Sequence, residues 1–356
     1  MNKAIYSILS FLVIACSPAV NSEQELKKTI MLNESVSSNL SISVSKMATQ
    51  HFEPIVPIKQ ESLNKELVKL GQVLYHDKRL SKDGNISCNS CHDLEAYGVD
   101  NLPTSPGDEQ KNGDRNSPTV LNAGDHIAQF WDGRAATIED QAGMPILNPV
   151  EMNIPNEQFL VDRLMEVELY QNLFSKAFPT TLKPITYSNI RNAIGAFERT
   201  LVTPSRFDEF IKGNNEALTN QEKEGLALFV KTGCTSCHNG KLLGANSYQK
   251  FGVTADYWTY TKSKLRDEGR FKETSEPADK YVFKVPGLRN ISETFPYFHD
   301  GSVEKLSDAV WIMAKVQLDQ DLSENDVSLI VKFLESTNGT LPSATKKPPV
   351  ELAQNI

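Results

Sequence analysis

The sequence predicts a mostly α-helical protein whose globular part has two similar halves with long loops and little β structure. Three observations lead to this prediction. Apolar residues recur at helical spacing, alternation of Val, Ile and Thr is scarce, and one set of short strings occurs twice in the same order. About 280 residues lie between the polar ends, which is enough for two domains with their own cores.

The N-terminus has the features of a bacterial export signal. Lys3 precedes an apolar run, Ile5 to Ala15, that is too short to span a bilayer. The run ends in Val13-Ile14-Ala15-Cys16, which is similar to a lipoprotein cleavage site. We therefore expect lipidation at Cys16 and a membrane-anchored protein in the periplasm. Ser17 favours the outer membrane. The alternative is an ordinary signal that is cleaved a few residues later.

The composition changes along the chain and suggests the domain limits. The Ser- and Asn-rich segment after the signal predicts a flexible tether, and the Pro- and Lys-containing end predicts a loosely packed tail. A helical pattern over 190–201 is expected at the junction of the halves. The expected parts are a signal peptide (1–15), a lipidated tether (16–55), an N-terminal domain (56–200), a C-terminal domain (201–335) and a tail (336–356).

Two pentapeptides predict the chemistry. Cys88-Asn89-Ser90-Cys91-His92 and Cys234-Thr235-Ser236-Cys237-His238 each have the Cys-x-x-Cys-His pattern of c-type haem attachment. The thiols form thioether links and the histidine is the proximal iron ligand. A zinc site built from the four cysteines is the alternative, but it leaves both histidines unexplained. We therefore expect two covalently bound haems, which makes electron transfer and peroxide chemistry the first hypotheses.

The two halves share more than the haem motifs, which predicts an internal duplication. A helical pattern precedes each motif, with Leu63, Leu67, Leu70 and Leu74 before the first and a capping box from Thr219 to Glu222 before the second. After each motif come an Arg-Asn pair and then an aromatic-x-Asp-Gly string. These are Arg115-Asn116 with Phe130-Trp131-Asp132-Gly133, and Arg289-Asn290 with Phe298-His299-Asp300-Gly301.

The charge balance bears on the partners. A formal net charge of −8 argues against a nucleic-acid partner and could help to steer a basic cytochrome.

The chain resembles the bacterial di-haem cytochrome c peroxidases, which share their fold with the di-haem methylamine-utilisation enzyme. The resemblance covers residues 60–335. It implies reduction of hydrogen peroxide to water with electrons from a small cytochrome c or a copper protein. Related enzymes are often dimers whose interface responds to calcium, so a homodimer is an option. The matching strings, besides the haem motifs, are Arg115 to Val120, Gln129 to Arg134, Pro149 to Asn153, Lys284 to Asn290, Pro296 to Gly301, Ala309-Val310, Met313 and Gln317-Leu318.

The sixth ligand distinguishes the two haems in this family. Met313 matches the family's methionine ligand, although a helical Met is otherwise most often core filler. A thioether favours ferrous iron, so Met313 opposite His238 would make the C-terminal haem the high-potential one. His92 would hold the N-terminal haem, where peroxide binds.

The resemblance also assigns catalytic residues. Glu151 is the expected acid–base group for breaking the O–O bond, and its apolar neighbours would raise its pKa by partial burial. Gln141 would hydrogen-bond the bound peroxide, and Trp131 would carry electrons between the haems. The plain alternatives are a surface glutamate and a packing tryptophan.

One calcium ion is implied between the haems. Its protein ligands would be the Asn116 side chain and the backbone carbonyls of Thr294 and Pro296. Oxygen ligands with waters suit calcium. His299 lies in a matching string but is given no catalytic role.

The chain departs from the family at one loop. Many members place a histidine there that caps the peroxidatic iron in the oxidised enzyme, whereas this sequence has Asp108. A carboxylate replaces a neutral nitrogen ligand poorly, so we favour an open or water-bound iron. The need for reductive activation stays open. The alternatives are caps by His126 or by Met144.

Two other functions compete with a peroxidase. A methylamine-utilisation-type oxidase acts on a partner protein, but that enzyme has Tyr where this chain has Met313. A pure electron carrier would have two six-coordinate irons and no use for Glu151. The sequence leaves the electron donor, the oligomeric state and the anchoring membrane open.

Overall fold

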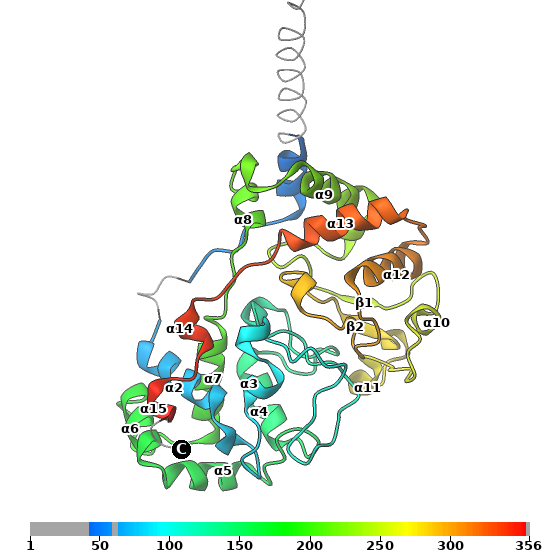
Figure 1. The fold of residues 1–356 in the computed structure, drawn as a ribbon. Coiled ribbons are helices and arrows are strands. Elements are labelled where there is room, and N and C mark those ends of the chain that lie inside the picture. Colours follow the sequence, from blue (N-terminus) through cyan, green and yellow to red (C-terminus); the bar gives the residue numbers. More distant parts are fainter. Residues whose placement is uncertain (1–42, 59–62, 354–356) are drawn as a thin grey trace, which may run out of the picture.

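A computed structural model describes residues 43–58 and 63–353 of the 356-residue chain (Figure 1). Helices predominate among these residues, and the only strands, β1 (Tyr248–Lys250) and β2 (Val282–Lys284), form one antiparallel pair. The mostly α prediction is confirmed. The helices are α2 (Lys65–His76), α3 (Cys88–Cys91), α4 (Ile138–Leu147), α5 (Glu157–Met165), α6 (Glu168–Ala177), α7 (Tyr187–Glu198), α8 (Arg206–Ile211), α9 (Asn220–Thr232), α10 (Tyr257–Thr261), α11 (Phe271–Thr274), α12 (Leu306–Leu318), α13 (Glu324–Glu335), α14 (Ser343–Lys346) and α15 (Val350–Ala353).

The first core forms around helices α2 and α7. Asn64 caps α2 by accepting a hydrogen bond from the Leu67 backbone N–H, and the apolar face of α2 then packs on α7. Gly71 allows this close approach, because a Cβ there would overlap the backbone of Ala193. Helices α4, α5 and α6 complete the core. The pattern over 190–201 lies mostly in α7. Ile190, Ala193 and Ile194 pack in this first core, whereas Phe197 and Leu201 pack in a separate cluster that includes Val120 and Leu341. Its expected place at the junction of the halves stays a prediction.

The second core forms around α9 and α13. The predicted capping box is present, since Thr219 and Glu222 exchange side-chain and backbone hydrogen bonds. Gly225 has the same role as Gly71, because a Cβ there would overlap the carbonyl oxygen of Leu329. Helix α8 contributes Phe207 and Phe210 to this core, and the start of α12, at Leu306 and Val310, borders it.

The tether prediction is wrong for its last part. Residues 43–51 are helical and pack on the second core beside α9 (Figure 1). Val44, Ala48, Phe52 and Ile55 are at most 3 % exposed. Their apolar side chains give this segment enough buried surface to stay ordered. The signal peptide, Cys16 and the rest of the tether lie outside the described residues.

The tail prediction is also wrong for residues 336–353. After α13 the chain returns to the first core, where α14 and α15 lie beside α2 (Figure 1). Leu352 is buried in that core. The Gln72 side chain donates to the carbonyls of Ala344 and Lys347, and Lys69 pairs with Glu351. These polar contacts and the buried Leu352 side chain therefore hold the C-terminal segment on α2, although its composition predicts loose packing.

Long loops bring the two halves together. The backbone N–H of Asn116 donates to His299 O at 2.8 Å, and that of Lys284 donates to Trp131 O at 2.8 Å. Ile127 N–H donates to Ala245 O at 3.0 Å. These bonds form a polar backbone junction between the two helical cores. Within the described segments, the helices lack the length and hydropathy needed to cross a membrane.

Candidate functional site

The second Cys-x-x-Cys-His motif lines a large apolar cavity. Cys234, Cys237 and His238 face it from the loop after α9, and Met313 faces it from α12. Its walls are mainly aliphatic and aromatic, which suits a flat hydrophobic macrocycle. The structure thus places the predicted proximal histidine and the predicted thioether ligand on the same cavity.

The local geometry of His238 fits an iron ligand. The residue is buried, and its Nδ1–H donates to the Leu243 carbonyl at 3.1 Å. Burial lowers the pKa of His238 to about 4, so its ring is neutral at pH 7. This tautomer directs the Nε2 lone pair away from Leu243, the usual arrangement of a ligating histidine. A haem therefore fits these residues.

The first motif has matching features. Cys88 and Cys91 bound the short helix α3, and His92 is its C-terminal cap. Burial lowers the pKa of His92, while the Asp100 carboxylate and the backbone carbonyls of Gly98 and Pro118 act to raise it. The Tyr75 hydroxyl donates to the His92 carbonyl at 2.6 Å and ties the motif to α2.

Glu151 lies close to the first motif. Burial raises the pKa of Glu151, while the Arg134 guanidinium and a hydrogen bond from the Asn148 side chain at 2.8 Å oppose this rise. Burial likewise raises the pKa of the Cys91 thiol to about 11, and Glu151 adds to that rise. The expected partial burial of Glu151 is confirmed, and its carboxyl is near the first haem motif.

Helix α4 carries the other predicted distal residues. Gln141 and Met144 are one turn apart and share a face of this helix. The helix ends at Leu147, and a tight turn follows in which the Glu151 N–H donates to the Asn148 carbonyl at 3.0 Å. One helix and its C-terminal turn thus position both Gln141 and Glu151. Met144 is 42 % exposed, and its role as a cap stays a prediction.

Asp108 lies next to the same turn. Its N–H donates to the Glu151 carbonyl at 2.7 Å, and its Oδ2 accepts from the Asp83 N–H at 3.0 Å. The side chain is buried. The loop at which this chain departs from the family therefore contacts the segment that carries Glu151, with a carboxylate that is already hydrogen-bonded.

Trp131 lies at the junction between the halves. It lines the cavity of the second motif and also a smaller cavity of about 50 Å³ that includes His126 and Lys284. The indole N–H donates to the Asn116 carbonyl at 2.9 Å, and the ring meets His299 edge to face. These contacts fix the ring in one orientation.

His126 is poorly placed to cap an iron. Its Nδ1 accepts a hydrogen bond from the Lys284 ammonium at 3.2 Å, because an ammonium can only donate. The ring proton is then on Nε2, which leaves no lone pair for a metal. A cap by His126 would require this hydrogen bond to break.

The predicted calcium residues share one cavity. Asn116, Thr294 and Pro296 all line the cavity of the second motif. The Asn116 side chain donates to the Leu102 carbonyl at 3.0 Å. Within the described segments, three or more His, Cys, Asp or Glu side chains do not gather in a way that could hold a metal. A calcium ion here would depend on amide and carbonyl oxygens.

Sequence reasoning missed two buried charged groups. Glu198 on α7 is 4 % exposed, and burial raises its pKa to about 8. Lys284 on β2 is 7 % exposed. The available signal for Glu198 was its place four residues after Ile194, on the apolar face of α7. For Lys284 the only signal was its place in a matched string, because its burial depends on contacts between the halves.

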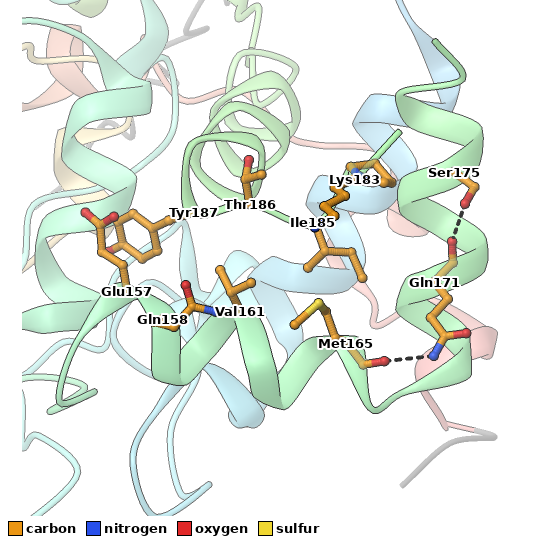
Figure 2. A pocket seen from close by; sticks show the side chains of 11 residues that line it. Glu157, Gln158, Val161, Met165, Gln171, Ser175, Lys183, Ile185, Thr186 and Tyr187 are labelled. Carbon is orange, nitrogen blue, oxygen red and sulfur yellow. Dashed lines mark hydrogen bonds between the residues drawn. The ribbon is translucent and has the colours of Figure 1, made fainter. Parts of the chain in front are cut away.

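Another hollow is lined by residues of neither motif. It measures about 660 Å³ and lies between α5, α6 and the start of α7 (Figure 2). Val161, Met165 and Ile185 form its apolar part, and Glu157 and Lys183 lie at its edge (Figure 2). It has no residue of either haem motif in its lining, so it does not belong to the haem sites.

The chain matches known proteins over most of its length. Residues 65–216 match the family profile described as di-haem cytochrome c peroxidase. Cytochrome c551 peroxidase of Nitrosomonas europaea is 44 % identical over 82 % of this chain and 85 % of its own. The enzyme of the same name from Pseudomonas aeruginosa is 43 % identical, covering 82 % and 84 %. The methylamine utilization protein MauG of Methylorubrum extorquens is 36 % identical, covering 70 % and 68 %.

Solved structures have the same fold as this chain. A MauG-like protein associated with microbial copper homeostasis superposes with a TM-score of 0.71, at 28 % identity and with 84 % of this chain and 97 % of its own covered. The diheme peroxidase BthA of Burkholderia thailandensis has the same fold, with a TM-score of 0.66, 20 % identity and 82 % and 92 % covered. The chain belongs to the di-haem cytochrome c peroxidase family and is a haem-dependent enzyme of the peroxidase type.

Proposed function

We propose that this protein reduces hydrogen peroxide to water with electrons from a small cytochrome c or a copper protein. The names of the relatives at 43–44 % identity support peroxidase activity. The observation that carries the proposal is the contrast between the two motifs. Met313 shares a cavity with the second motif, whereas a partly buried carboxyl lies near the first.

The two haems, when bound through the four motif cysteines, supply the redox chemistry, and the protein sets potential, access and proton delivery. His238 and Met313 would hold the electron-accepting haem in a high-potential state. His92 would hold the peroxidatic haem, with no protein cap or a water in the sixth position. Trp131, fixed between the halves, is the proposed bridge for electrons.

Glu151 is the proposed proton carrier. A carboxylate near the peroxide site can take a proton from one oxygen of the substrate and deliver it to the other. The Asn148 hydrogen bond holds this carboxyl in place, and Gln141 from the preceding helix would orient the substrate by a hydrogen bond.

The calcium site is part of the proposal. Asn116, Thr294 and Pro296 would hold the ion beside the second cavity, with waters completing its oxygen ligands. The ion would tie the loops of the two halves together, and a homodimer sensitive to calcium is the proposed assembly.

An internal duplication is also proposed. Asn116 precedes Trp131 by the same spacing as Lys284 precedes His299, so the halves can be aligned with Asn116 on Lys284 and Trp131 on His299. In this alignment the two backbone hydrogen bonds across the junction are equivalent, because Asn116 N–H donates to the His299 carbonyl and Lys284 N–H donates to the Trp131 carbonyl. Asn122 and Asn290 both have left-handed backbone conformations and begin 3₁₀ turns. In this alignment Asn290 corresponds to Asn122 and not to Asn116. The two Arg-Asn pairs are therefore not equivalent positions, in contrast to the sequence-based expectation.

The export signal supports a periplasmic lipoprotein anchored through Cys16, with the outer membrane favoured. This part rests on the sequence alone, because residues 1–42 are outside the described residues. Radiolabelled palmitate should label the wild-type protein in a bacterial host and leave the Cys16→Ser variant unlabelled.

Spectra of the purified ferric protein test the main proposal. We expect a high-spin fraction from the His92 haem that shifts on adding hydrogen peroxide, together with steady peroxide turnover when a reduced small cytochrome c is supplied. Two low-spin haems in both redox states, with no turnover, would instead identify an electron carrier.

The MauG relatives make a protein-modifying oxidase the second candidate. That reading predicts that the C-terminal haem lacks a sulfur ligand. The near-infrared band of a methionine–iron bond separates the two: its presence supports the peroxidase, and its absence supports the oxidase.

A further inference from the structure

Lys284 is a buried cation without an acidic partner. Its side chain is 7 % exposed, and its hydrogen bond goes to the neutral Nδ1 of His126 at 3.2 Å. The other buried cations at the junction are compensated. Arg289 pairs with Asp208 at 2.9 Å, and Arg115 pairs with Asp132 and Asp267. Among the described residues, an equivalent carboxylate for Lys284 is absent from the ion pairs.

An unpaired buried charge is costly, so this arrangement calls for an anion. Burial lowers the pKa of Lys284 to about 8, which still leaves the amine mostly protonated at pH 7. His126 holds the ammonium in position but adds no negative charge, and the nearby Arg289 is itself a cation. A bound anionic group in these cavities would supply the compensating charge.

The position of Lys284 identifies that group. The residue lines both the small junction cavity and the large cavity of the second motif, and the linings of both cavities contain no Asp or Glu. Its backbone N–H is bonded to the carbonyl of Trp131 at 2.8 Å, which fixes its strand against the junction. The occupant proposed for the large cavity, a c-type haem, carries two peripheral carboxylates.

We propose that Lys284, seated by His126, binds a carboxylate of the haem attached at Cys234 and Cys237 and thereby helps to set that haem's potential. This inference rests on the proposed placement of the second haem. A positive charge at the haem edge disfavours the more positive ferric state, so it raises the reduction potential. Lys284 and Met313 then act in the same direction on one centre, from its edge and from its face.

Redox titration of the purified two-haem protein tests this inference. Lys284→Met keeps the length of the side chain and removes its charge, whereas Lys284→Arg keeps the charge. Lys250→Met is the matched control, because Lys250 lines the same cavity but is exposed. We expect Lys284→Met to lower the equilibrium constant for reduction of the high-potential haem roughly tenfold. This corresponds to a decrease of about 59 mV in its one-electron reduction potential. Lys284→Arg and Lys250→Met should stay close to wild type.

Resonance Raman spectra give a second measurement. The bending mode of the haem propionates should shift in Lys284→Met and not in Lys250→Met. An unchanged potential and an unchanged propionate mode in Lys284→Met would overturn the proposal. So would an equal loss of potential in Lys250→Met, which would indicate a general charge effect.

Two further outcomes keep the result unambiguous. If the wild-type potential shifts with inorganic phosphate concentration and that of Lys284→Met does not, the ammonium binds an exchangeable anion and the carboxylate assignment is wrong. The titration needs no peroxide turnover. If both irons prove to be six-coordinate and the protein has no peroxidase activity, the proposed function is wrong. The potential of the second haem in Lys284→Met would still test the role of Lys284.

Discussion

At Glu151, burial and a neighbouring cation act on the same carboxyl in opposite directions. Burial raises its pKa, and the Arg134 guanidinium limits the rise. The carboxyl is therefore held nearer to neutrality than a surface glutamate, which suits a group that must both accept and release a proton.

Glu151→Gln tests this role. We expect both haems to remain bound and peroxide turnover to fall by about 10²-fold, the usual scale for an acid–base group. In the wild type, turnover should fall as the pH drops through the raised pKa of Glu151, because protonation removes the base. The variant should lose this acid limb. Steady-state rates from pH 4 to 8 measure both effects, and Glu151→Asp is the control that keeps a carboxylate. Undiminished turnover in Glu151→Gln would exclude the residue from the mechanism.

Met313→Leu tests the thioether ligand. Leu has a similar volume and no sulfur, so the apolar wall of the cavity should be kept while iron ligation is lost. We expect the high-potential step of a redox titration to move to lower potential and the methionine–iron band to disappear. Met165→Leu is the matched control, because Met165 lines the separate hollow between α5 and α6. A titration identical to wild type would make Met313 a packing residue.

Asp108→His tests the open sixth position. The loop backbone at residue 108 is bonded to the Glu151 carbonyl, so an imidazole introduced there would start close to the first haem site. We expect the oxidised enzyme to become low-spin and to require prior reduction before it turns over peroxide. Asp108→Asn keeps an acceptor for the Asp83 N–H and should behave as wild type. Unchanged ferric spectra in the histidine variant would show that this loop does not reach the iron.

At the scale of elements, each core depends on one close helix–helix contact at a glycine. Gly71 lets α2 approach α7, and Gly225 lets α9 approach α13. A side chain at either position meets backbone rather than a flexible side chain, so relief requires the helices to separate.

Gly71→Ala and Gly225→Ala should therefore destabilise the protein. We expect a loss of about 1–3 kcal/mol in the free energy of unfolding for each, the usual range for overpacking. Gly113→Ala is the control, because a Cβ there meets nothing within 4 Å. Denaturant unfolding of the two-haem protein measures the changes. Stability equal to that of Gly113→Ala would mean that these helix pairs adjust without cost.

At the scale of the whole molecule, both ends of the described part of the chain pack on the half that is distant in sequence. Residues 43–52 pack on the second core, and Leu352 of α15 packs in the first, where Gln72 of α2 also donates to the Ala344 carbonyl of α14. The two halves are therefore held together by crossed terminal segments as well as by the loop junction.

Leu352→Ala tests the C-terminal crossing. Leu352 is 3 % exposed in the first core, so its truncation should cost about 2–5 kcal/mol in the free energy of unfolding. Val350→Ala is the matched control, because Val350 is 70 % exposed and should change stability little. Thermal unfolding of both variants measures the difference. Equal melting temperatures would show that the last helix adds nothing to the fold.

The sequence alone determined the haem motifs, the helical class and the family, because these depend on residue types at short fixed spacings. The capping box of α9 and the partial burial of Glu151 also followed from local patterns. Tertiary structure decided what depends on distant partners. The packing of residues 43–55 and of Leu352, the hydrogen bond that commits His126 to Lys284, and the unpaired charge of Lys284 all arise from segments far apart in the chain. Their burial is a property of the folded junction, which no local pattern encodes.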